Sequence, residues 1–137
     1  MKIYTIGYGG RNPKEFIDIL QQKGIKTVVD VRLRPDHAHM GLFKKSKSPE
    51  EGIQGMLSKA DIGYVSLIEL GNIFIECEDW SNRYRRLLDS AGELLTQRLK
   101  DVSEPYCLLC AEKSPPECHR YLISEYLTRQ GHEIEHL

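Results

Sequence analysis

The sequence lacks long apolar segments and any recognisable targeting segment. No uninterrupted apolar run approaches the ~20 residues that a transmembrane helix needs. Met1 leads directly into strand-like residues 2–6, without the charged and apolar regions of a signal peptide. The pattern therefore indicates neither a membrane-spanning nor a secreted protein, and we expect a cytoplasmic one.

The chain also lacks an excess of charge of either sign. Its formal net charge of −1 argues against a protein that coats nucleic acid through bulk charge. Positive charge is nevertheless concentrated in residues 32–47, where only Asp36 opposes it. The basic and histidine residues of this loop are Arg32, Arg34, His37, His39, Lys44, Lys45 and Lys47. Such a loop suits a small anion or a phosphate-bearing segment, and it is also typical of a solvated, flexible surface.

The chain has four cysteines but lacks a context in which they would form disulfides. They are Cys77, Cys107, Cys110 and Cys118. An even count can mark a disulfide framework in a small secreted protein, but here the secretion signal is missing. A chain of 137 residues can also build a core without cross-links. We therefore expect reduced thiols.

What the sequence does contain is a regular alternation of strand-like and helix-like segments. The strand-like segments are residues 3–6, 25–32, 64–67, 106–110 and 132–137. Strands that alternate with helices need crossover connections. We therefore predict an α/β protein, a three-layer α/β/α arrangement with a mostly parallel sheet of about five strands, in a single domain over residues 1–137.

Helix starts are marked by a recurring local pattern. Asn12, Ser48 and Ser114 are each followed by proline and then glutamate, which predicts helix N-caps. The longest helix is predicted over residues 80–99, where apolar residues recur at helical spacing.

Four loops should meet at one edge of this sheet, because ligands of open parallel sheets bind beyond the carboxyl ends of the strands. These loops are residues 7–10, 30–34, 69–72 and 110–120. In the same four segments, polar residues interrupt the apolar pattern. Two independent arguments thus place the candidate site at this edge.

The strongest chemical signal lies in the last of these loops. Cys110 and Glu112 follow a strand, whereas Cys118 and His119 fall in the first turns of a predicted helix. A helix N-terminus favours anions and lowers the pKa of a thiol. We predict these four residues as candidate catalytic groups. The alternative is that both thiols are inert and only pack the core.

The spacing does not predict a metal centre. Cys107 and Cys110 are three apart in a strand and should point to opposite faces. Cys118 and His119 are adjacent on a helix and should diverge by ~100°. A tetrahedral zinc site is not expected from these positions, and we assign no metal ligand.

The predicted ligand-binding residues include charges at the end of the second strand. Asp30, Arg32 and Arg34 alternate and share a face while the strand lasts. Charges at this place suit a ligand, and they equally suit an internal pair between Asp30 and an arginine. Arg120 could fork onto a phosphate or carboxylate, or instead pair with Glu112 or Asp30.

Three further residues join this ligand-binding set. Gly7 and Tyr8 begin a glycine-rich turn after the first strand. The turn is only a weak match to a phosphate-binding loop. Glu69 follows the third strand at the same predicted edge.

Several of these segments together resemble a known family, the domain-of-unknown-function family 488. The matching pieces are residues 5–7, 29–32, 64–65, 69–71, 110–112, 115–120 and 131–133, so the resemblance spans nearly the whole chain. It implies the same α/β fold and the same site residues, and it implies no reaction. Family members often carry histidine after the first-turn glycine. Here that position is Tyr8, so any acid–base role would pass to Tyr8 or His119, or be absent. Residues 72–81 match poorly, and nothing is transferred there.

Three functional hypotheses remain open at this point. The first is an enzyme or enzyme-like binder of an anionic ligand, a nucleotide or nucleic-acid end, with Cys/His-dependent catalysis. The second is a non-catalytic nucleic-acid-binding module that uses Arg32, Arg34 and the lysines of residues 44–47. The third is a metal or redox protein built on Cys110, Cys118 and His119. No cofactor is assigned.

Overall fold

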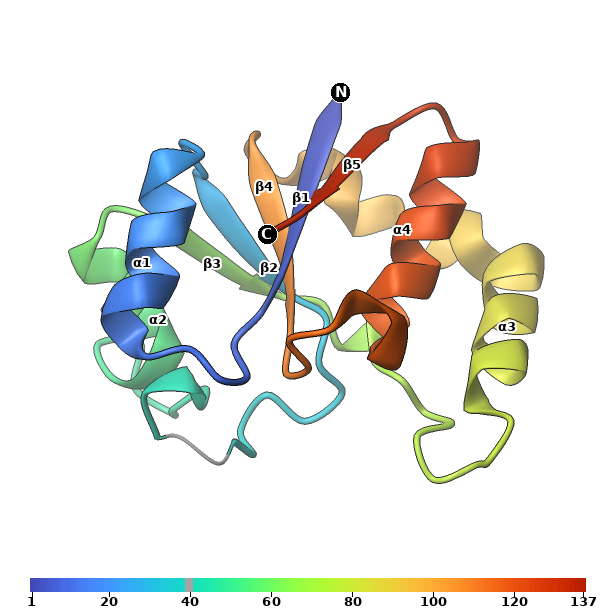
Figure 1. The fold of residues 1–137 in the computed structure, drawn as a ribbon, viewed down its shortest axis with the longest axis horizontal. Helices are drawn as coiled ribbons and strands as arrows, with labels where there is room; N and C mark the ends of the chain where they lie inside the picture. The colour runs from blue at the N-terminus through green and yellow to red at the C-terminus, as the bar shows by residue number, and fades with distance from the viewer. Residues whose placement is uncertain (39–40) are drawn as a thin grey trace.

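A computed structural model describes residues 1–38 and 41–137, and its centre is a five-stranded, all-parallel sheet (Figure 1). The strand order is β3-β2-β4-β1-β5. The strands are β1 (Lys2–Gly7), β2 (Thr27–Asp30), β3 (Gly63–Ser66), β4 (Tyr106–Cys110) and β5 (Glu133–His136). The predicted α/β class and parallel sheet are confirmed.

Helices cover both faces of the sheet (Figure 1). Helices α1 (Pro13–Gln22) and α2 (Gly52–Lys59) pack on one face, and α3 (Trp80–Leu95) and α4 (His119–Arg129) pack on the other. Short 3-10 helices lie in the connections: η1 (Gly41–Phe43), η2 (Ile68–Leu70), η3 (Gln97–Asp101) and η4 (Pro115–Glu117). The predicted three layers are confirmed. No helix in the described residues is long and apolar enough to cross a membrane.

Strand β4 divides two apolar cores, one on each face of the sheet. All five of its residues are buried, as expected for a central parallel strand. Cys107 and Leu109 pack with α1 and α2, whereas Leu108 and Cys110 pack with α3 and α4. The prediction that Cys107 and Cys110 point to opposite faces is confirmed.

The predicted start of α2 and the predicted end of α3 differ from the structure. Asn12 caps α1 as expected, since its side-chain oxygen accepts the backbone N–H of Glu15 at 2.9 Å. Ser48 does not cap α2, which begins at Gly52, because the Ser48 hydroxyl instead donates to the Glu50 carboxylate in a local turn. The long helix ends at Leu95 rather than at residue 99 and continues as the 3-10 helix η3.

The chain changes direction across the sheet between two neighbouring strands, β1 and β4. From β1 the chain turns onto the face with α1, and from β4 it turns onto the face with α4 (Figure 1). The loops after these strands therefore separate, and such a switch point is where open α/β sheets bind ligands. The fold thus places a cleft beyond the carboxyl ends of β1, β2 and β4.

Candidate functional site

A cleft of about 450 Å³ lies at this switch point. Its walls come from the loops after β1, β2 and β4, from the segment before α3 and from the start of α4. The lining residues are Tyr8, Arg32, Leu33, Arg34, His37, Asn72, Ile75, Trp80, Cys110, Ala111, Glu112, Glu117, Cys118 and His119. A volume of this size suits a small molecule.

Two thiols and one imidazole gather at the wall of the cleft. The Sγ atoms of Cys110 and Cys118 and a ring nitrogen of His119 all lie within 4.8 Å of one another. Nδ1 of His119 is 3.8 Å from each sulfur. All three residues are buried, and they are called the thiol–imidazole cluster below.

The prediction that Cys118 and His119 diverge was wrong. Helix α4 begins at His119, later than the cap signal at Ser114 predicted, and Cys118 is its N-cap. With φ −127° and ψ 142°, Cys118 is extended rather than helical. The 100° rotation between successive helical residues therefore does not apply to this pair, and both side chains reach the same point.

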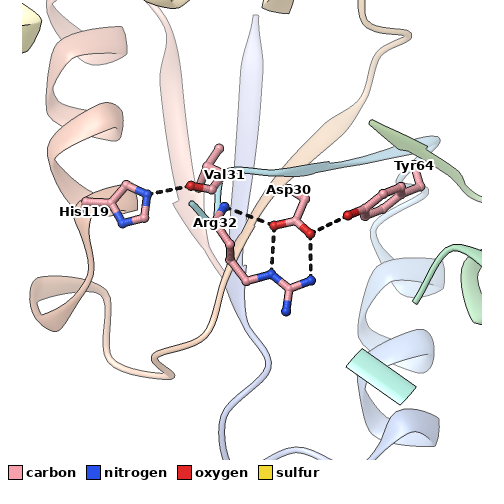
Figure 2. A network of polar contacts seen from close by, with 5 residues as sticks. All are labelled: Asp30, Val31, Arg32, Tyr64 and His119. Atoms are coloured by element: carbon pink, nitrogen blue, oxygen red, sulfur yellow. Dashed lines mark hydrogen bonds and ion pairs between the residues drawn. The ribbon is translucent and has the colours of Figure 1, made fainter. Parts of the chain in front are cut away.

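The orientation of His119 is fixed by the main chain of β2. Nε2 of His119 lies 2.7 Å from the carbonyl oxygen of Val31 (Figure 2). A carbonyl only accepts, so Nε2 carries the proton in this contact. In the neutral ring Nδ1 then presents its lone pair to both sulfurs. The ring of Tyr84 packs edge-on against the imidazole at 5.3 Å.

The two thiols differ in acidity. Burial opposes ionisation of Cys118, but its contacts with the Cys110 thiol, with the His119 imidazole in its protonated, charged form, and with the backbone N–H of Arg120 outweigh burial and lower the pKa of Cys118. Hydrogen bonding to Cys118 and burial raise the pKa of Cys110. Burial and the neighbouring Cys118 likewise raise the pKa of Glu112. The predicted effect of the helix N-terminus on a thiol thus falls on Cys118.

A buried ion pair stands on the other side of the cleft. The guanidinium of Arg32 donates from Nε and Nη2 to the two carboxylate oxygens of Asp30, at 2.9 and 2.7 Å (Figure 2). The hydroxyl of Tyr64 donates to the same carboxylate at 2.6 Å. The predicted internal pairing of Asp30 is therefore present.

One nitrogen of the Arg32 guanidinium, Nη1, takes no part in the ion pair with Asp30. Nη1 is buried and has no hydrogen-bond partner within the described residues, and it points away from Asp30 (Figure 2). The guanidinium lies 5.3 Å from the centre of the Tyr8 ring, and that ring stacks on Phe43. Arg32 and Tyr8 both line the cleft.

The other predicted ligand-binding residues divide into two groups. Arg34 is exposed at the cleft. Glu69 lies away from the cleft lining and forms a two-pronged pair with Arg98, at 2.6 and 2.7 Å. In the basic loop, His37 is exposed at the cleft, and His39 lies outside the described residues.

Arg120 and Gly7 shape the site from behind it. Arg120 is fully buried and donates to the carbonyl oxygens of Glu112 and Lys113, at 2.6 and 3.2 Å. A Cβ at Gly7 would lie 1.7 Å from the Glu112 carbonyl oxygen. The loop after β4 therefore packs directly on the end of β1, which only glycine permits.

Several groups that support or line the site were not predicted from the sequence. The Val31 carbonyl orients His119, and a backbone acceptor leaves no signal in the sequence. Tyr64 and Tyr84 support the two halves of the site. Trp80, the first residue of the predicted long helix, was not expected at the site and also lines the cleft.

Comparison with known proteins identifies a family and nothing narrower. Neither the curated proteins nor the solved structures gave a match to this chain. The family model described as "Domain of unknown function DUF488" matches residues 12–127. That range includes α1 to α3, α4 up to Leu127 and every residue of the thiol–imidazole cluster, and it leaves β1 and β5 outside. The chain therefore belongs to the DUF488 family.

Proposed function

We propose that this protein is an enzyme that binds a small anionic ligand in the cleft and acts on it through the thiol–imidazole cluster. The ligand class is a nucleotide or the end of a nucleic acid. The observation that carries the proposal is that a buried guanidinium with an unused nitrogen and a buried cluster of reactive side chains line one cleft.

The unused nitrogen favours an anion. A buried N–H without a partner costs roughly 1–3 kcal/mol, and an oxyanion in the cleft is the kind of acceptor that Nη1 lacks. Guanidinium groups hold phosphate and carboxylate oxygens with charge-assisted hydrogen bonds. Because Asp30 already fixes the other side of Arg32, the remaining donor is held in a set direction.

Charge at the rim supports the same ligand class. Arg34 and His37 are exposed and line the cleft. Arg32 itself is neutralised by Asp30, so Arg34 supplies the uncompensated positive charge that attracts an anion from solution.

The apolar part of the cleft lining suits a flat or apolar group that is attached to the anion. Leu33, Ile75 and Trp80 line the cleft together with these charges. A nucleobase has faces that stack on aromatic and apolar side chains. A cleft of about 450 Å³ has the volume of a small-molecule site, so a mononucleotide or a single-stranded end fits better than a base-paired duplex.

Binding can be tested with the only tryptophan of the chain, Trp80, as the reporter. Inorganic phosphate and AMP should change its fluorescence with saturation, and Arg34→Gln should weaken binding about 2- to 5-fold, the effect of one exposed ion pair. Arg98→Gln is the matched control, because Arg98 lies outside the cleft and pairs with Glu69. No saturable change with either probe, confirmed by calorimetry, would contradict the proposal.

Alkylation tests whether the ligand reaches the cluster. AMP should slow the reaction of Cys110 and Cys118 with iodoacetamide several-fold, while half-buried Cys77, outside the cleft, serves as an internal control. Binding only to long single strands, with steep salt dependence and no protection of these thiols, would instead indicate the non-catalytic nucleic-acid module.

A further inference from the structure

We infer that Cys110, Cys118 and His119 form a zinc-binding site with three protein ligands and a fourth position open to the cleft. The site itself stands on the geometry of the cluster. Its use in catalysis rests on the function proposed above.

The donor atoms have the spacing of ligands that share one ion. In a tetrahedral zinc site, Zn–S distances of about 2.3 Å and Zn–N distances of about 2.0 Å place sulfur and nitrogen about 3.6 Å apart. Here both sulfur–nitrogen distances are 3.8 Å, and all three donors lie within 4.8 Å of one another. The imidazole nitrogen is thus equally close to two thiols, an arrangement that one bound cation explains for both.

The donors are also oriented as metal ligands are. A zinc-bound imidazole usually donates its second N–H to a carboxylate or backbone carbonyl. His119 makes this contact from Nε2 to Val31, which directs the Nδ1 lone pair at the sulfurs. The backbone N–H of Arg120 donates to Sγ of Cys118 at 3.4 Å, a contact that supports a thiolate.

Among the described residues the cluster supplies three donors and no fourth, and the nearby Glu112 carboxylate contacts the Cys110 thiol, at 3.5 Å. Cys107, the other cysteine of β4, packs in the core on the opposite face of the sheet. All three cluster residues line the cleft, so an ion held between them would face it. Three protein ligands and an open position are typical of catalytic rather than structural zinc.

A zinc ion here would deepen the proposed function in one respect. The cleft would gain a Lewis acid whose open position could take an oxygen of the anionic ligand, while Arg32 contacts the same ligand. Soft thiolate and imidazole donors favour zinc over magnesium or calcium, so the site would not be a hard-cation site for nucleotide phosphates.

Metal content and cobalt substitution test the site. Purified wild-type protein should contain one zinc per chain by mass spectrometry, and the metal-free protein should bind one Co²⁺ with a sulfur-to-cobalt charge-transfer absorption band. His119→Asn and Cys118→Ser should lose both signals, while Cys77→Ser keeps them. Circular dichroism checks that each variant is folded; if Cys118→Ser does not fold, His119→Asn decides.

Two results would overturn the zinc site: folded, metal-free wild-type protein that gives no such band, or His119→Asn protein that gives the wild-type band. The phosphate titration on zinc-free protein separates this outcome from the proposed function. If zinc does not bind but phosphate still changes the fluorescence of Trp80, only the zinc site is contradicted. Zinc binding with no response to phosphate or AMP leaves the site and removes the anion proposal.

Discussion

Two arginines at the candidate site, Arg32 and Arg120, are buried, and they use their donors differently. Arg32 pairs with the carboxylate of Asp30, and its Nη1 has no partner in the part of the chain that the structure describes. Arg120 donates to uncharged oxygens, the carbonyls of Glu112 and Lys113 and the hydroxyl of Thr5. Both were candidate ligand-binding residues, yet Arg120 does not line the cleft. A buried arginine next to a site can therefore either bind a ligand or hold the loop that carries the site.

The largest effect should come from removing the partner of Arg32. We expect Asp30→Ala to lower the free energy of unfolding by about 3–5 kcal/mol, because a guanidinium is left buried without its counterion. Urea unfolding measures the loss, and Asp79→Ala, which removes an exposed partner of Arg83, is the control. Phosphate should raise the unfolding midpoint of Asp30→Ala more than that of wild type, since an anion can replace the carboxylate. Equal losses in the two variants would show that the pair is not stabilising.

The second-largest effect should come from replacing Arg120, which holds the loop after β4. Replacing this residue, as in Arg120→Met, leaves the carbonyls of Glu112 and Lys113 without their donor, and we expect a loss of about 2–4 kcal/mol from two such groups. Arg129→Met, at the exposed end of the same helix, is the matched control. A distinguishing readout is the cobalt band, which should weaken in Arg120→Met because the loop places Cys110. An unchanged band would mean that Arg120 does not position the cluster.

A smaller effect on stability should come from Tyr64, which donates to Asp30 beside Arg32. Tyr64→Phe removes one hydroxyl donor to Asp30, which we expect to cost about 1–2 kcal/mol in unfolding free energy. Tyr4→Phe, at a half-buried tyrosine of β1, controls for the loss of a hydroxyl. If both variants match wild type, Arg32 alone satisfies Asp30.

The smallest expected effect is a pH dependence on the Arg120 side. Partial burial and the charge of Arg120 lower the pKa of His136 below its ordinary 6.5, and His136 also contacts Thr5 and the Tyr121 ring. At pH values near and below 6.5, His136 is protonated more fully in the unfolded chain than in the folded protein. The free energy of unfolding should therefore fall as the pH falls from about 7 to 5. His136→Gln should flatten this slope and His132→Gln should not. The slope should also shrink in Arg120→Met, and an unaltered slope there would exclude the charge as a cause.

Local patterns predicted the elements well and their ends less well. The five strands, the Asn12 cap and the opposite faces of Cys107 and Cys110 follow from short-range periodicity. The start of α4 was missed because the Ser114 signal opens a 3-10 turn of two prolines and Glu117. The true cap is Cys118, whose thiol accepts the Arg120 N–H, a role that sequence rules rarely give to cysteine.

The sequence by itself determined the sheet, its two helical layers and the edge at which polar residues gather, because these depend on periodicity and on the geometry of parallel strands. Only the tertiary structure decided what those polar residues do. It brought Cys118 and His119 together through an extended cap, turned Arg120 onto a loop, placed Glu69 against Arg98 and left Nη1 of Arg32 without a partner among the described residues. Each of these depends on side-chain directions across separate elements, and spacing along one segment does not contain that information.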